Sequence, residues 1–200
     1  MAEWFEEIST YLPKYLSADA TNELFEELKQ FPRNIDSRLY TSKLKDDPGL
    51  FQGDGLARVW VSNLPDPRVE TVRVMVISNT CDVTVENKKL LGPRLIYCPI
   101  ISLPKYAQMV TASREIAADR HISDIRQQRI ASMFYLPRID ALGEESVALL
   151  DRINNCDLQA LNLGELVATR LFTLSDYGFY LFLFKLSIHL TRIRENVARN

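Results

Sequence analysis

The sequence predicts an α+β protein, a small antiparallel β-barrel with helices before it, inserted in it and after it. Short apolar runs separated by turns with Pro or Gly fill residues 39–174, which is the pattern of a small barrel. Apolar residues recur at helical spacing in residues 2–31 and again after residue 175. A third helical pattern, near residues 105–131, interrupts the strands.

Residues 1–38 are predicted to form an N-terminal arm of two helices. The second helix begins at a cap on Ser17 or Asp19 and ends at Pro32, whose ring cannot continue a helix. Seven acidic and two basic residues in 2–31 give the arm a net charge of −5. This charge fits either a solvated surface or an acidic cover over a basic site elsewhere.

Residues 39–174 are predicted to hold the barrel, with short connections between its strands. The central strand is Val69–Ser78, because its second half is apolar on both faces, as in a strand covered on both sides. Residues 105–131 are expected to form one or two helices inserted between strands. The other strands are predicted at residues 39–44, 56–64, 95–103, 133–136, 146–153 and 168–174.

Residues 175–200 are predicted to form a long C-terminal helix, capped by Ser175 or Asp176. Its first half is apolar nearly all round, so we expect it to be buried. A heptad-like seam runs along the helix in steps of four and three, through Phe179, Leu183, Leu186, Leu190, Ile193 and Val197. The basic second half either complements the helix dipole or belongs to a helix that binds a partner or a second copy.

Composition excludes several classes of protein. With 24 Lys and Arg against 26 Asp and Glu, the net charge of −2 excludes a general polycation, so any nucleic-acid site must be local. Three cysteines without paired spacing predict free thiols, buried in the core, and a cytoplasmic location. Two histidines and scattered cysteines predict neither a metal site nor a cofactor. The acidic N-terminus is unlike a signal peptide, and the apolar run 179–190 is too short to span a membrane.

Three stretches, in this order, resemble the MazF/PemK family of toxin-like endoribonucleases. In the first, Gly53-Asp54 opens an alternating strand that ends in Leu64-Pro65. In the second, residues 74–79 are followed by residues 95–102, and in the third, residues 145–153 are followed by residues 157–161.

The resemblance implies an SH3-like barrel, usually a homodimer, that cuts single-stranded RNA without a metal and belongs to a toxin or phage-defence system with an antitoxin partner. The alternative is a barrel that has no catalytic activity and binds another protein through its insertion and its C-terminal helix. The sequence leaves both open.

RNA cleavage of this kind needs a cation beside the phosphate and a group that handles the proton of the 2′-oxygen. The resemblance implies Arg73 as the cation and Ser102 as the hydroxyl. Each stands one residue beyond the family's position, which Val72 and Ile101 occupy, and a one-residue slip turns a strand side chain to the opposite face.

Asp82 is the third candidate catalytic residue, because it ends the polar cluster Ser78-Asn79-Thr80-Cys81-Asp82 after the central strand. The alternative is that this cluster hydrogen-bonds its own turn. Candidate contacts to RNA phosphates are Arg58, Arg68 and Lys105, which otherwise are ordinary surface charges.

Overall fold

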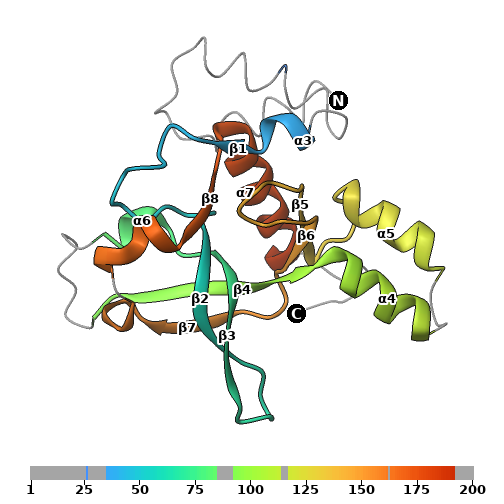
Figure 1. Cartoon of the computed structure of the whole chain (residues 1–200), viewed down its shortest axis with the longest axis horizontal. Helices are drawn as coiled ribbons and strands as arrows, with labels where there is room; N and C mark the ends of the chain where they lie inside the picture. The colour runs from blue at the N-terminus through green and yellow to red at the C-terminus, as the bar shows by residue number, and fades with distance from the viewer. Residues whose placement is uncertain (1–25, 27–34, 85–91, 114–116, 162, 192–200) are drawn as a thin grey trace, which may run out of the picture.

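An open antiparallel sheet of eight strands forms the centre of the protein, with helices against it (Figure 1). The computed structural model describes residues 26, 35–84, 92–113, 117–161 and 163–191. The strand order is β1-β8-β2-β3-β4-β6-β5, and β7 pairs with β4 beside this path. The predicted α+β class with an antiparallel sheet is therefore confirmed.

Three long neighbouring strands carry the sheet. They are β2 (Gly55–Ser62), β3 (Val69–Val76) and β4 (Arg94–Ser102). The strand predicted at 146–153 ends at Leu149, and a separate short strand follows at Asn154–Asp157; both of them pair with β4. The short strands are β1 (Tyr40–Thr41), β5 (Met133–Leu136), β6 (Ser146–Leu149), β7 (Asn154–Asp157) and β8 (Arg170–Leu174).

The inserted segment forms two helices, as predicted: α4 (Leu103–Ser113) and α5 (Ala118–Arg126), which lie side by side at one end of the molecule (Figure 1). The helix predicted after residue 175 is α7 (Asp176–Thr191). The predicted arm helices and residues 192–200 fall almost wholly outside the described residues. The short helices are α3 (Ile35–Arg38), α6 (Leu166–Thr169), η1 (Thr80–Asp82), η2 (Leu158–Ala160) and η3 (Leu163–Glu165).

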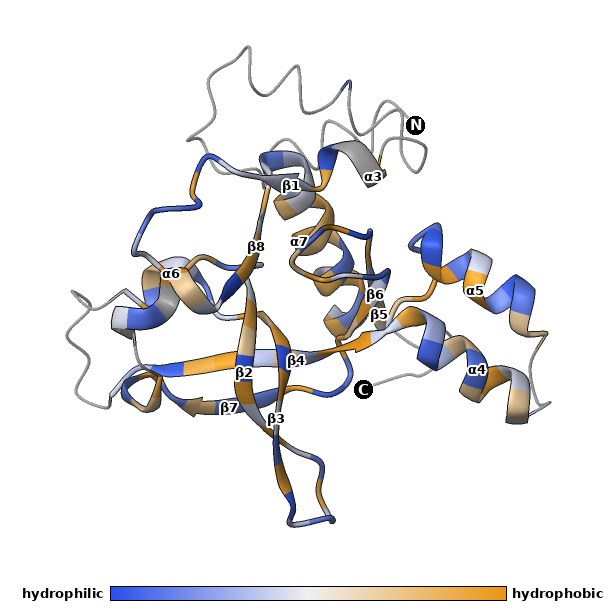
Figure 2. Ribbon diagram, in the orientation of Figure 1, coloured by the Kyte–Doolittle hydropathy of each residue, from blue (hydrophilic) through white to orange (hydrophobic). Residues whose placement is uncertain are grey.

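The two faces of the sheet cover two different apolar cores. Side chains alternate along a strand, so β3 sends Met75 into one core and Val74 and Val76 into the other. All three are 0% exposed, which confirms that this strand is covered on both sides. Figure 2 shows hydrophobic and hydrophilic residues interspersed along β2 and β3.

Helix α7 packs on the core that contains Met75. Phe182 meets Phe134 edge to face, with 5.4 Å between ring centroids. Gly178 permits the close approach, because a Cβ there would lie 2.2 Å from the carbonyl oxygen of Leu39. The expectation that the first half of this helix is buried nearly all round is wrong on one side, where Phe184 is 37% exposed. In the second half, Leu190 is 60% exposed. The helix packs on the sheet with one face, so its opposite face is left uncovered by the sheet.

Helix α7 also buries a lysine. Lys185 is 5% exposed, and its Nζ donates to the backbone oxygen of Gln128. Gln128 has a left-handed backbone with φ 56°, and its side chain exchanges two hydrogen bonds with the backbone of Tyr135. Burial lowers the pKa of Lys185 to about 7. The amine therefore ties α7 to the turn that ends α5.

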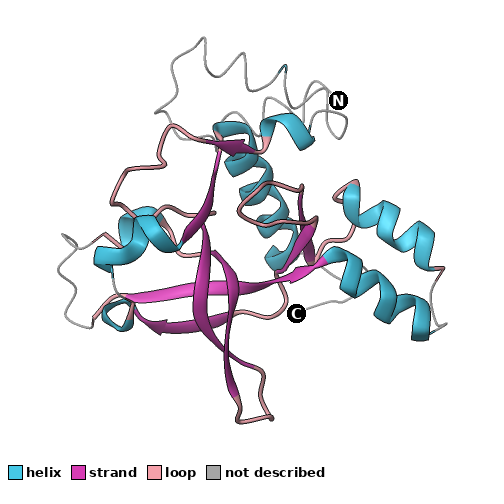
Figure 3. Ribbon diagram, in the orientation of Figure 1, coloured by secondary structure: helices cyan, strands magenta, loops and turns pink. Residues whose placement is uncertain are grey.

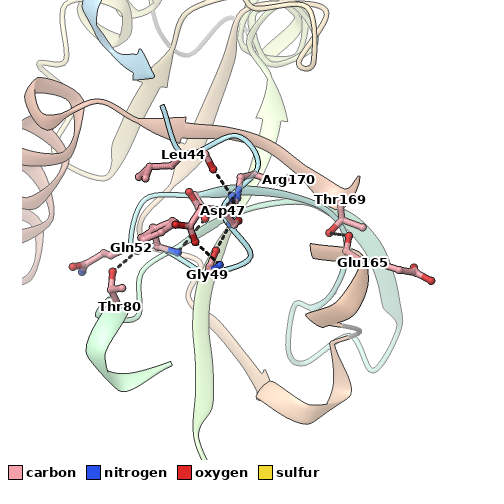
Figure 4. Close-up of polar contacts among 10 residues, drawn as sticks. Leu44, Asp47, Gly49, Gln52, Thr80, Glu165, Thr169 and Arg170 are labelled. Atoms are coloured by element: carbon pink, nitrogen blue, oxygen red, sulfur yellow. Dashed lines mark hydrogen bonds and ion pairs between the residues drawn. The ribbon is translucent and has the colours of Figure 1, made fainter. Parts of the chain in front are cut away.

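Arg170, the first residue of β8, anchors the loop before β2 (Figure 4). Its guanidinium donates to the carbonyl oxygens of Leu44 at 2.8 Å, Asp47 at 2.9 Å and Gly49. Its Nε lies 3.1 Å from Asp54 Oδ2, and these two side chains are 3% and 0% exposed. Burial raises the pKa of the Asp54 carboxyl, and the Phe51 amide and the Arg170 charge oppose that rise. Asp54 of the Gly53-Asp54 motif therefore belongs to a buried ion pair.

We predict that Arg170→Met lowers the free energy of unfolding by about 3–5 kcal/mol, because removal of one partner leaves a buried charge without compensation. Three loop carbonyls lose their donor at the same time. Urea denaturation measures the change. Arg138→Met, at an exposed site, is the matched control, and equal stability of the two variants would contradict the prediction.

Candidate nucleic-acid interface

The β2–β3 hairpin projects from the rest of the molecule, clear of the helices (Figure 3). Val59 and Val61 of β2 point into the core that contains Val74. Trp60 lies between them and therefore points to the opposite face of the sheet. It pairs with Thr71 of β3 and is 43% exposed. A large aromatic side chain thus stands at the surface in mid-strand.

Arg73 shares this face, because it lies two residues from Thr71 on the same strand. Arg73 in turn pairs with Ile100 of β4, and Ser102 lies two residues beyond Ile100. The fold therefore places Trp60, Arg73 and Ser102 on one face of three adjacent strands. Two of the three predicted catalytic residues are brought together in this way.

A β-bulge adds Arg58 to the same place. Leu56 pairs with Val74 and Val59 pairs with Val72, so Ala57 and Arg58 together oppose Arg73 alone. Arg58 is exposed and has a left-handed backbone, with φ 59°. Such a conformation is uncommon for a residue other than glycine and clusters at functional sites.

Two cations thus stand across from each other, and the Arg58 side chain makes no hydrogen bond or ion pair with another described residue. We call Arg58, Trp60, Thr71 and Arg73 the bulged face.

Arg73 is held by the connection between β5 and β6. Its Nη1 donates to the carbonyl oxygen of Leu142 at 2.8 Å, and its Nη2 lies 3.9 Å from Glu144 Oε1. The Arg73 and Glu144 side chains are 29% and 37% exposed. An ion pair this long and this exposed is weak and can exchange with another anion.

Ser102 has a structural position. It is 6% exposed, and its hydroxyl accepts a hydrogen bond from the backbone N–H of Lys105 at 3.2 Å. A serine immediately before a helix satisfies a free N–H of the first turn in this way. The hydroxyl is therefore closed to solvent, while the Lys105 side chain lies exposed on the first turn of α4.

Asp82 lies apart from Arg73 and Ser102. It ends η1, which follows Ser78, and the Ser78 hydroxyl accepts from the N–H of Ile96 at 2.7 Å, near the start of β4. Ser102 stands at the other end of that strand. The Asn79 side chain accepts from the N–H of Cys81 at 2.9 Å, so part of the polar cluster hydrogen-bonds its own turn, as the alternative held.

All three cysteines are free thiols, as predicted. Cys98 is buried, and burial raises the pKa of its thiol to about 12. Cys156 is half-buried. The expectation that Cys81 is buried is wrong, because η1 leaves it exposed.

Arg68 lies on the other face of the hairpin, at a shallow pocket of about 250 Å³. Its guanidinium grips the Asp66 carboxylate through Nε at 2.8 Å and Nη2 at 2.5 Å. This bond holds the pKa of Asp66 below its ordinary value. Arg152, which the sequence did not single out, shares the pocket. The floor is apolar and includes Val61, Val72, Pro99 and Ile101.

The sequence analysis missed two residues of the bulged face, Thr71 and Trp60. For Trp60 the signal was present, because Val59 and Val61 alternate with it in a predicted strand whose inward positions are apolar. The bulge left no such signal, since neither Ala57 nor Arg58 is a residue that favours a left-handed backbone.

Among the described residues, no group of three His, Cys, Asp or Glu side chains is placed to hold a metal ion. In the same part of the chain, no helix is both long and apolar enough to cross a membrane. Neither a family model nor a curated protein matches this chain.

Proposed function

We propose that this protein binds single-stranded RNA on the bulged face of the hairpin. The observation that carries the proposal is the position of Arg58, an exposed cation held in a left-handed backbone directly across from a second cation, Arg73. Two like charges at neighbouring positions repel each other, and a phosphate between them removes the repulsion. The net charge of the chain is −2, so this attraction is local.

We propose that the strands around the core that contains Val74 and Val76 form an SH3-like barrel of the MazF/PemK kind. These strands are β8, β2, β3, β4 and β7. Two bonds support closure: Ser62 N–H of β2 donates to Asn154 Oδ1 of β7 at 2.9 Å, and the Tyr97 hydroxyl donates to the carbonyl of Trp60. In a toxin or phage-defence system, such a barrel would act on single-stranded RNA.

The proposal is binding without cleavage. Cleavage needs a hydroxyl, acid or base beside the cation, and the Ser102 hydroxyl is buried as a helix cap. Asp82 lies beyond the opposite end of β4. The bulged face therefore offers cations for phosphates but neither of the two other predicted catalytic residues. Near Arg73, the Thr71 hydroxyl is exposed and the Glu144 carboxylate is partly exposed, and cleavage would have to use one of them.

We expect Arg58→Ala and Arg73→Ala each to weaken RNA binding and to reduce its salt dependence. Each lost phosphate contact lowers the slope of log K against log salt by about 0.7 for a single strand. Fluorescence anisotropy with a labelled single-stranded RNA, at several salt concentrations, measures both effects. Arg120→Ala removes the same charge from α5, where the side chain is 87% exposed, and serves as the control.

Two outcomes would contradict this proposal. One is that the parent protein binds no single-stranded RNA, and the other is that all three variants bind alike. The same RNA is then run on a denaturing gel. If the parent protein cuts this RNA and Arg73→Ala does not, the function is RNA cleavage and the proposal of binding alone is wrong.

Glu144 competes with RNA for Arg73 in this account. We expect Glu144→Gln to tighten RNA binding by up to about fivefold, since an exposed ion pair contributes up to about 1 kcal/mol. Asp140→Asn removes the same charge from the same connection, at an exposed residue with no bond to Arg73. Equal gains in both variants would assign the effect to net charge alone and contradict the competition.

A second candidate function is a barrel that binds another protein, and the outward side of α7 favours it. Phe184, Ile188 and Leu190 are 37%, 39% and 60% exposed on this helix. Leu183 and Leu190 of the predicted seam both lie on that side. A second copy of the chain is the occupant that the family resemblance implies.

If α7 holds a dimer together, Leu190→Glu should convert the dimer into a monomer, because it places a charge in an apolar interface. Gln108→Glu, which adds the same charge at an exposed position of α4, is the control. Light scattering coupled to size-exclusion chromatography gives the mass of each. A parent protein that is monomeric at all concentrations would exclude this interface.

A further inference from the structure

We infer that Trp60 stacks on an unpaired base of the bound RNA, an inference that rests on the proposed function. Trp60 is 43% exposed in the middle of β2, whereas Val59 and Val61 beside it are 2% and 5% exposed. No aromatic ring or cation of the described chain packs on the indole. Its flat surface is therefore open to a ligand.

The backbone beneath the indole is fixed. The Trp60 carbonyl oxygen accepts a hydrogen bond from the Tyr97 hydroxyl. Tyr97 is 1% exposed and lies in the core that contains Val74. Trp60 also pairs with Thr71 across the ladder. Because the backbone is already held, only the side-chain torsions of Trp60 have to be ordered when a ligand binds, which limits the entropy lost on binding.

The neighbouring charges favour a nucleic acid as the ligand. Arg58 lies two residues from Trp60 on the same strand, and Arg73 is its diagonal neighbour on β3. Diagonal neighbours on one face of a sheet lie about 7–8 Å apart. A nucleotide whose phosphate contacts either guanidinium can therefore place its base on the indole.

This arrangement selects unpaired bases. Every base has a π-face, so stacking is tolerant of sequence, but the faces are hidden inside a duplex. The cations fix the backbone and the indole takes the base, which is the combination that proteins use for single strands. Duplex RNA of the same length can satisfy the cations only.

The experiment compares Trp60→Ala with Trp60→Phe, against two labelled probes. One probe is a single-stranded RNA of mixed sequence and the other is an abasic oligonucleotide of equal length, which keeps the phosphates and lacks bases. We expect Trp60→Ala to weaken RNA binding by about 5- to 100-fold and to leave abasic binding unchanged. Trp60→Phe keeps an aromatic face and should retain most of the affinity.

Fluorescence provides a second measurement in a protein whose hairpin is intact. The sequence has two tryptophans, so Trp4→Phe leaves Trp60 as the only one. A stacked base should quench the emission of Trp60 as single-stranded RNA saturates the protein, and the abasic oligonucleotide should not. A duplex competitor should displace the RNA less well than an unlabelled single strand does.

The outcomes separate this inference from the proposed function. If Arg58→Ala and Arg73→Ala weaken RNA binding while Trp60→Ala does not, the stacking inference is wrong and the phosphate contacts stand. Unchanged emission at saturation, or equal competition by duplex RNA, also overturns stacking. If the parent protein binds neither probe, both proposals fail together.

Discussion

The junction where β8 begins against β2 is the constraint on which the rest of the structure depends. Arg170, the first residue of β8, pairs with Leu56, and its guanidinium holds Asp54 and the loop before β2. From there β2 continues with only β3 on its ladder, and the bulge at Ala57 and Arg58 follows at once. The buried ion pair fixes where β2 begins, and the bulge determines which side chains oppose Arg73.

Much of the fold could be predicted from periodicity. The doubly covered β3, the inserted helices and the start of α7 all follow from apolar spacing, because burial imposes a period of about two on strands and 3.6 on helices. The break between β6 and β7 and the side of α7 left exposed could not be predicted. Both depend on what lies opposite in space, which spacing along one chain does not record.

The site was predictable only in part. The resemblance proposed Arg73 and Ser102, and the ladder does place them on one face, through the pairing of Arg73 with Ile100. The resemblance did not indicate that the Ser102 hydroxyl caps α4 or that Asp82 lies beyond the far end of β4. The sequence marked Arg58 only as one of several surface cations. Its position opposite Arg73 follows from the bulge and the left-handed backbone, which the sequence does not indicate. Hydrogen bonds to a neighbouring element and a local backbone conformation decide these roles.

A resonance-by-resonance titration tests the central claim most directly. Single-stranded RNA is added to isotopically labelled protein, and the backbone amides, the Trp60 indole N–H and the arginine side chains are followed by NMR. The account predicts that the largest shifts fall on Arg58, Trp60, Thr71 and Arg73. Shifts confined to the pocket of Arg68 and Arg152, on the opposite face of the hairpin, would contradict it.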